Sequence, residues 1–247
     1  MDTLHSKCVN IYHYTSFDSA KKMLTKEGIK IKAYHYSKYG DDDYEWTKEI
    51  ATPVIKGICI EKGWYFDIDD PNDPFFISFC KTENYDYMWE CFNRDQSGVA
   101  LVFDRIIIEN HACKDLNPDA FMDCIYTDNP KEMKSFLLDF GWDNYNIETI
   151  NDQQGDLKDL STFIIKPKHM NELECRYVFL HRKNMYFSSD GEFDEEEIGK
   201  TDYVEILFPK EALVGVIIGP QSDVEPEEIV DILRQNNYGD HIKIDKK

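Results

Sequence analysis

Residues 9–28 read VNIYHYTSFDSAKKMLTKEG and have the pattern of a strand followed by a helix. The first seven residues are rich in β-branched and aromatic side chains, which favour a strand. Ser16 then stands where a helix N-cap is expected, and apolar residues follow it at helical spacing, namely Phe17, Ala20, Met23 and Leu24. Gly28 is the expected helix stop. The chain therefore opens as strand and helix, and residues 29–33 predict a second short strand.

Over the whole chain, residues 1–247, the sequence predicts one α+β domain in which strands and helices do not alternate regularly. Strands are expected at residues 75–80, 98–104, 121–128, 172–181, 202–209, 212–220 and 241–245. Helices are expected at 85–92, 130–140, 156–165 and from about 225, and less clearly at 46–60, where Pro53 and Gly57 weaken the pattern. Residues 34–45, 67–74 and 191–197 have the composition of loops.

The composition is that of a folded protein with an acidic surface. The 247 residues include 15 Tyr, 15 Phe and 4 Trp, more core material than a disordered chain carries. With 28 basic and 48 acidic residues the formal net charge is −20. This charge disfavours passive binding to nucleic acid or to an anionic membrane, although a local basic groove is compatible with it.

Cysteine spacing, the N-terminal residues and the lengths of the apolar segments indicate the cellular compartment. The seven cysteines form no CxxC or other close pair, which indicates neither a disulfide framework nor a zinc knuckle. The N-terminal residues lack the regions of a signal peptide, and the longest apolar stretch, residues 212–219, is too short to span a membrane. We therefore expect a cytoplasmic protein with reduced cysteines, no membrane partner and no metal.

Three polar clusters stand on or at the ends of predicted strands. They are His13-Tyr14-Thr15, Ser78 within FFISFC, and Glu172 and Glu174 within NELECR. Each has a structural explanation when taken alone. His13 suits a hydrogen-bonded strand position, Ser78 a small filler position, and the glutamates an exposed face.

Taken in order, the clusters resemble the signature of the ADP-ribosyltransferase superfamily, which has Arg or His on the first strand, Ser or Tyr on a middle strand and Glu on a later one. The chain is also similar to a bacterial family of unknown function with HYT near the start, SFS before a tryptophan-bearing helix, ExExR, and a late strand ending in GP. The matching segments are 13–15, 78–80 with 88–89, 172–176 and 217–220, so this second resemblance spans nearly the whole chain. The resemblance implies a split mixed or antiparallel sheet with flanking helices and NAD as a substrate.

On this resemblance the catalytic residues are Glu174 and Glu172. Glu174 would bind the ribose 2′-hydroxyl and stabilise the positive charge that develops as the nicotinamide–ribose bond breaks. Glu172 lies two residues away on the predicted strand, hence on the same face, and would orient the acceptor or act as its general base.

The same resemblance implies a set of cofactor-binding residues. His13 would bind a ribose hydroxyl of the adenosine half, and the neighbouring backbone at Tyr14 and Thr15 would bind the nicotinamide amide. Ser78 would hold Glu174 in place. Stacking on the nicotinamide would fall to Tyr14, Tyr34 or Phe79.

Three features depart from the signature or give it another meaning. Cys80 stands where the family often has a second hydroxyl, and His13 replaces the Arg of one large branch. Arg176 is expected on the same face as both glutamates, where a cross-strand ion-pair ladder is the structural explanation of ExExR. Catalytic and structural interpretations of the glutamates therefore both stand.

Our first hypothesis is an ADP-ribosyltransferase that modifies a macromolecule, protein or nucleic acid, as a toxin or an antiphage effector. Toxin-type members are commonly held by an antitoxin, so an antitoxin or regulatory protein is an expected partner. The second hypothesis is a catalytically silent member of the fold that binds a nucleotide or a partner. Convergence of His13, Ser78 and Glu174 on one cleft would favour the first.

The third hypothesis is a metal-dependent nuclease, which carboxylates and histidines converging without Ser78 would favour. Its candidate ligands are residues 41–43 and 67–73 with His111, His169 and His181, none of which has the spacing of a known metal loop. Walker, GxGxxG and GxSxG motifs are absent. One loose basic patch combines Lys166, Lys168, Arg176, Arg182 and Lys183.

Overall fold

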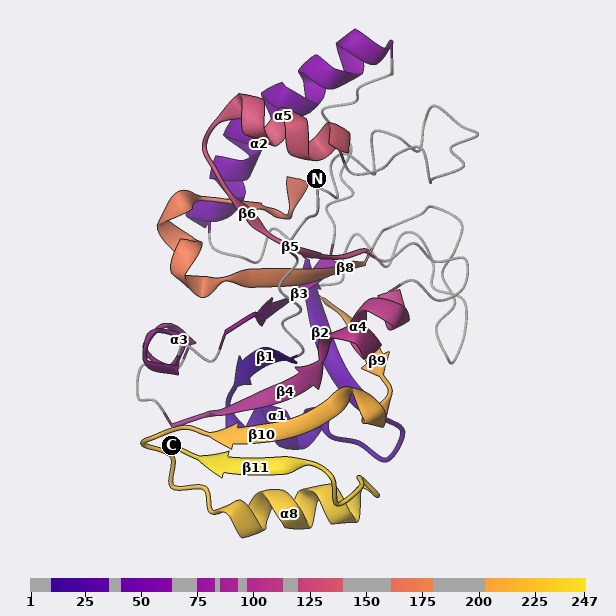
Figure 1. Cartoon of the computed structure of the whole chain (residues 1–247), viewed down its shortest axis with the longest axis vertical. Coiled ribbons are helices and arrows are strands. Elements are labelled where there is room, and N and C mark those ends of the chain that lie inside the picture. Colours follow the sequence, from indigo (N-terminus) through magenta and orange to yellow (C-terminus); the bar gives the residue numbers. More distant parts are fainter. Residues whose placement is uncertain are drawn as a thin grey trace, which may run out of the picture.

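The structure, a computed structural model, describes residues 10–35, 41–63, 75–82, 85–92, 97–112, 120–139, 161–179 and 203–247. It is α+β, as predicted, with helices around a large mixed sheet (Figure 1). Most of the large sheet follows the order β11-β10-β4-β1-β3-β2-β9, with β8 also paired to β3 and β5 paired to β8. The first strand lies in the middle of this order.

The strands of the large sheet are β1 (Asn10–Thr15), β2 (Ile29–His35), β3 (Phe75–Cys80), β4 (Val99–Asp104), β5 (Ala120–Asp123), β8 (Glu174–Phe179), β9 (Tyr203–Phe208), β10 (Leu213–Ile218) and β11 (Lys243–Lys246). A separate two-stranded parallel sheet consists of β6 (Ile125–Tyr126) and β7 (Ile164–Ile165). In the large sheet only β10 and β11 pair in parallel among the described residues.

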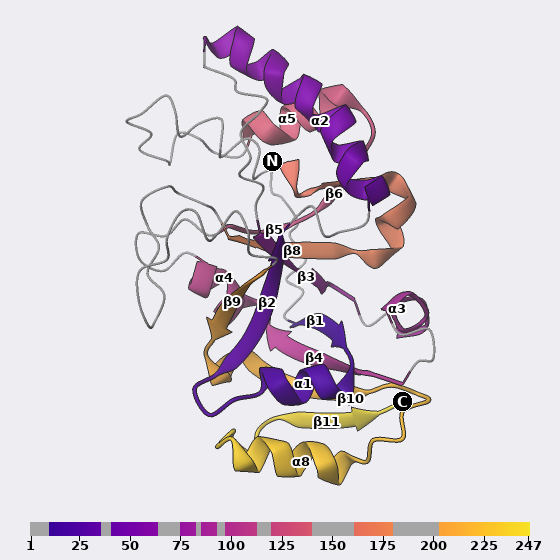
Figure 2. The same ribbon diagram turned by 180° about the vertical axis from the view of Figure 1, so that it is seen from behind.

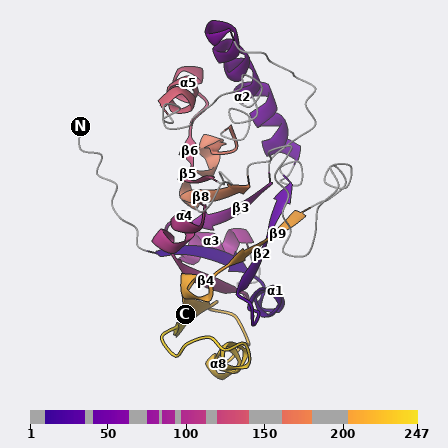
Figure 3. The same ribbon diagram turned by 90° about the vertical axis from the view of Figure 1, so that its right-hand side faces the viewer.

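The helices are α1 (Phe17–Met23), α2 (Asp41–Lys62), α3 (Tyr85–Phe92), α4 (Arg105–Ala112), α5 (Pro130–Asp139) and α8 (Pro226–Gln235), with short 3-10 helices η3 (Pro167–Glu172) and η4 (Lys210–Ala212). Figure 2 shows α1 in front of β4 and β10 when the molecule is seen from behind. Figure 3 shows α2 and α5 at one end of the molecule and α8 at the other. No described helix is long and apolar enough to cross a membrane.

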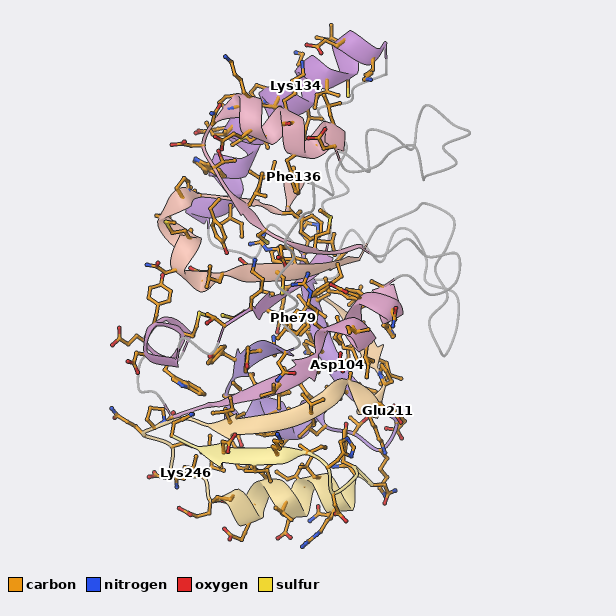
Figure 4. All side chains as sticks on the ribbon, viewed as in Figure 1. Phe79, Asp104, Lys134, Phe136, Glu211 and Lys246 are labelled. Atoms are coloured by element: carbon orange, nitrogen blue, oxygen red, sulfur yellow. The ribbon has the colours of Figure 1, made fainter. Side chains whose placement is uncertain are left out.

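Three buried clusters hold these layers together. The largest includes buried side chains from β1, β4, β10 and α8. A second one includes buried side chains from α2, α5, β3 and β8. Phe79 lies near the centre of the molecule (Figure 4), and its ring is 5.5 Å from Phe103, 6.0 Å from Phe121 and 6.4 Å from Phe208 between centroids. The third cluster packs Tyr14 edge-on against the fully buried Trp89 of α3.

The opening strand–helix unit forms largely as predicted. Ser16 caps α1, because its side chain accepts a hydrogen bond from the Ser19 backbone N–H. Gly28, however, does not end the helix, which stops at Met23. Gly28 has φ +154°, and a Cβ at this position would lie 2.4 Å from the Phe208 carbonyl oxygen. Its role is to let the start of β2 lie close to β9.

Several boundaries differ from the prediction because tertiary pairing overrides local composition. Residues 41–45, expected in a loop, belong to α2, which continues through Pro53. The expected strand 121–128 is two strands, since β5 pairs with β8 whereas β6 pairs with β7. In the expected helix 156–165, the described residues 161–165 end in strand β7. The predicted loops at 67–74 and 191–197 lie outside the described residues.

Candidate active site

The site lies where the large sheet splits beside β3. One edge of β3 pairs with β8 along its whole length. On the other edge, Phe75 and Phe76 pair with β2, whereas Cys80 pairs with Tyr12 of β1. Within the described residues, positions 77–79 have no strand partner on that edge, because β1 and β2 diverge there. The opening between β1 and β2 on this edge of β3 is therefore centred on Ser78.

His13 fills part of this opening with a side-chain hydrogen bond. Its Nδ1 lies 3.0 Å from the backbone oxygen of Ser78. A carbonyl only accepts, so Nδ1 carries the hydrogen, and in the neutral ring Nε2 keeps the lone pair. Burial lowers the pKa of His13 below its usual value, more than the Ser78 hydrogen bond raises it, which favours this neutral form. The ring also contacts Phe79, with 5.7 Å between centroids.

Ser78 links β3 to Glu174 on β8. The Ser78 hydroxyl donates to Glu174 Oε1. Ser78 pairs in register with Arg176 and Cys80 with Glu174, so all four side chains lie on one face of the two strands. The bond that the resemblance implied, Ser78 holding Glu174, is thus present.

Arg176 holds the same carboxylate. Its Nε donates to Glu174 Oε1 at 2.6 Å and its Nη2 to Oε2 at 3.1 Å, while Nη1 donates to the Thr162 carbonyl. The guanidinium also lies over the Phe76 ring, 4.2 Å from its centroid. Both charged side chains are about nine-tenths buried, at 10% and 8% exposure. This ion pair runs along one strand rather than between strands, and it omits Glu172.

Glu172 is not on the strand, contrary to the prediction. It is the last residue of η3, and Leu173 follows in the left-handed region with φ 45° and ψ 48° before β8 begins at Glu174. Glu172 and Glu174 therefore do not share a strand face, and that prediction was wrong. Glu172 instead accepts from His169, with 2.6 Å between Oε1 and Nδ1. Burial raises the pKa of Glu172 above its usual value, and His169 partly offsets this.

These residues line one cavity of 540 Å³. The predicted residues that line it are His13, Tyr14, Thr15, Tyr34, Ser78, Phe79, Glu172 and Glu174. The convergence of His13, Ser78 and Glu174 expected from the first hypothesis is confirmed as geometry. Their chemical roles stay predictions.

Comparisons of the chain with protein-family models, with curated protein sequences and with solved structures found no match.

The cavity also contains residues that the sequence reasoning missed. Lys22 of α1 and Lys30 and Lys32 of β2 line one part of it, and Lys32 Nζ lies 3.6 Å from the centroid of the Tyr203 ring. Trp46 of α2 lines it as well, with Lys166 Nζ 5.9 Å from its ring centroid. Alternating Lys30 and Lys32 in IKIKAYH was a usable signal, because alternation puts both lysines on one strand face.

Of the other candidates, Lys166, His169 and Arg176 line this cavity, whereas His111 does not. His111 contacts the Tyr177 hydroxyl, and Tyr177 alternates with Arg176 and so faces the opposite side of β8 from the cavity. Among the predicted basic residues Lys166 lines the cavity and Lys168 is exposed, whereas Arg182, Lys183 and His181 lie outside the described residues. No group of three or more His, Cys, Asp or Glu side chains suited to a metal ion occurs in the described part of the chain.

Proposed function

We propose that the protein is an NAD-dependent ADP-ribosyltransferase with the split-sheet fold of that superfamily. The observation that carries the proposal is the connection of His13, Ser78 and Glu174 through hydrogen bonds within one cavity. These residues match, in type and strand order, the three-part signature that the sequence resembles.

Glu174 would be the catalytic residue. A carboxylate has about four lone-pair positions, of which Ser78 and Arg176 occupy three in the described structure. The fourth, on Oε2, suits the 2′-hydroxyl of the nicotinamide ribose. Fixed in this way, the carboxylate would stabilise the oxocarbenium-like charge without reorganising during the reaction.

His13 and the three lysines would bind the substrate. The acceptor nitrogen of His13, Nε2, suits a ribose hydroxyl of the adenosine half, as the resemblance implies. Lys22, Lys30 and Lys32 supply positive charge for the diphosphate in a chain of net charge −20. A cavity of 540 Å³ is within the range of roughly 300–1,000 Å³ usual for ligand sites.

The acceptor in this proposal is a macromolecule, protein or nucleic acid, and the biological role is that of a toxin or antiphage effector. An acidic protein attracts a basic partner surface, which suits an antitoxin or regulatory protein. Labelled NAD incubated with the protein and whole-cell lysate tests the activity, and digestion with protease or nuclease then shows which treatment destroys the label. Label in neither fraction, with NAD intact, would contradict the proposal.

A second candidate is a catalytically silent member of the fold that binds a nucleotide. The Arg176 ion pair favours it, since a guanidinium on both oxygens offsets the carboxylate charge that catalysis needs. Calorimetric titration with NAD, together with an assay of nicotinamide release, separates the two. Binding without release, in the presence of lysate, supports the silent candidate.

A further inference from the structure

A histidine–carboxylate pair on η3 also lines the cavity. His169 and Glu172 are three residues apart on η3, and their side chains are 24% and 19% exposed. The distance from His169 Nδ1 to Glu172 Oε1 is 2.6 Å, and both residues line the same cavity as Glu174. The left-handed Leu173 separates this pair from the strand that carries Glu174.

The pairing determines which histidine nitrogen is basic. When ionised Glu172 accepts from Nδ1–H, the neutral imidazole carries its lone pair on Nε2. A carboxylate on Nδ1 fixes the ring orientation and stabilises the imidazolium that forms when Nε2 takes a proton. The pair therefore has the chemistry of a general base within a site where Glu174 is already occupied by Ser78 and Arg176.

We propose that His169 is the general base that deprotonates the acceptor, that Glu172 is its positioning residue, and that the acceptor group is a hydroxyl. This inference rests on the proposed function. A hydroxyl must lose its proton as it attacks, and the Nε2 lone pair of a neutral imidazole can accept that proton. A guanidinium has a pKa far above neutrality and holds its proton too tightly for such a base, so an arginine acceptor does not fit this pair.

The step balances without an oxidant or reductant. The bond between ribose C1′ and the nicotinamide nitrogen breaks, and its electron pair leaves with neutral nicotinamide. The acceptor oxygen bonds to C1′ while its proton moves to His169 Nε2 and later to solvent. Glu174 stabilises the cationic ribose and takes no proton.

Glu174 and Arg176 act electrostatically on Glu172, and other charged and titratable groups lie on or beside η3 and on the elements packed against it. Within the described residues they are Lys166 and Lys168 beside or on η3, Tyr126 on β6, Glu174 and Arg176 on β8, and Asp86, Tyr87 and Glu90 on α3. Because several groups titrate together, the test compares nucleophiles at one pH rather than pH profiles.

The experiment uses two small nucleophiles with the full chain and NAD. Methanol has a proton to lose and gives the methyl glycoside of ADP-ribose, whereas azide has none and gives the glycosyl azide. His169→Asn keeps an N–H near the position of Nδ1 but lacks a basic nitrogen. We expect it to slow methanolysis by about 100-fold, the usual contribution of a general base, and azide transfer by less than about 3-fold. His241→Asn, an exposed histidine outside the cavity, is the matched control.

Glu172→Gln keeps an acceptor for Nδ1–H but removes the charge. We expect a smaller loss of methanolysis, about 10-fold, with azide transfer again retained. Equal losses with both nucleophiles would show a structural role for His169 and overturn the inference, as would unchanged methanolysis. If the unmodified protein releases no nicotinamide with any nucleophile, the proposed function itself fails. Nicotinamide release that depends on Glu174 but not on His169 overturns only the assignment of His169 as the general base.

Discussion

Arg176 donates to both carboxylate oxygens of Glu174, two residues earlier on the same face of β8. Ser78 donates to Oε1 from the neighbouring strand, and Tyr126 Oη lies 2.5 Å from the Glu174 backbone nitrogen. The carboxylate is therefore fixed in place before any ligand binds. Such fixed geometry is expected both of a catalytic carboxylate and of a purely structural one.

The first prediction concerns the charge of Glu174. Glu174→Gln should lower nicotinamide release by about 100-fold or more, because an amide keeps hydrogen bonding but loses the charge that stabilises the cationic transition state. NAD should still bind, as measured by calorimetry. Glu211→Gln on η4, remote from the cavity, controls for the loss of one negative charge. Undiminished turnover in Glu174→Gln would remove this residue from the mechanism.

The second prediction concerns stability. Arg176→Met should lower the free energy of unfolding by about 3–5 kcal/mol, since it leaves a buried carboxylate without its counter-charge. Adding Glu174→Gln should recover part of that loss. Urea unfolding of the two single variants and the double variant measures the coupling. Strictly additive losses would show that the pair is not energetically coupled.

The third prediction concerns His13 and pH. Folding lowers the pKa of His13 below its reference value of 6.5. At a pH below that value, His13 therefore binds a proton more readily in the unfolded chain than in the folded protein. Stability should therefore decline as pH falls below about 6.5, towards the lower folded pKa. His13→Asn keeps an N–H for the Ser78 carbonyl and removes this titration. Measured at several pH values, the unfolding midpoints of the original protein and of His13→Asn should converge or cross as pH falls. Parallel curves would exclude His13 as a source of the pH dependence of stability.

The fourth prediction concerns the lysines of the cavity. Replacing Lys22, Lys30 and Lys32 together by Ala should raise the KM for NAD about 10-fold or more with a smaller change in kcat, because in the proposed binding mode these side chains would contact the diphosphate and not the reacting bond. The matched control replaces three exposed lysines outside the cavity, namely Lys62, Lys131 and Lys243. An equal rise in both triple variants would indicate a general charge effect instead of a diphosphate site.

The fifth prediction tests a backbone position. Gly28→Ala should destabilise the protein by about 1–3 kcal/mol, since φ +154° is unfavourable for alanine and its Cβ would meet the Phe208 carbonyl. Gly57→Ala, within α2 and with no atom near its added Cβ, should stabilise by about 0.5–1 kcal/mol. Thermal unfolding measures both, and opposite signs are expected. Two changes of the same sign would show that local conformation does not control these positions.

The sequence predicted those elements whose pattern is complete within a short window. β3 has its expected bounds because FFISFC is apolar except for Ser78, and α1 begins where Ser16 can cap it. The α4 helix is absent from the prediction, since Ile106, Ile107 and Ile108 read equally well as strand. Its start depends on the Asp104 carboxylate, which accepts from the Ile106 backbone N–H at 2.8 Å.

For the site, the residue types could be predicted from the sequence, but their hydrogen-bond partners could not. The strand order of the signature placed His13, Ser78 and Glu174 together, and the structure brings them together. Period-two reasoning failed at Glu172, because the left-handed Leu173 interrupts the strand. The pairing of Glu172 with His169 depends on η3, whose 3-10 geometry brings residues i and i+3 onto one side. No spacing rule for strands finds that pair.

The single pairing of β1 with β3, at Tyr12 and Cys80, also has a consequence for folding. β1 forms its long ladder with β4, and β3 forms its own with β8, so the two halves of the site are assembled in different ladders. We expect each ladder to open and close as its own cooperative unit. A variant weakened at this one bridge would then keep its circular dichroism spectrum while losing the alignment of His13 with Glu174, and inactivation would precede unfolding on heating.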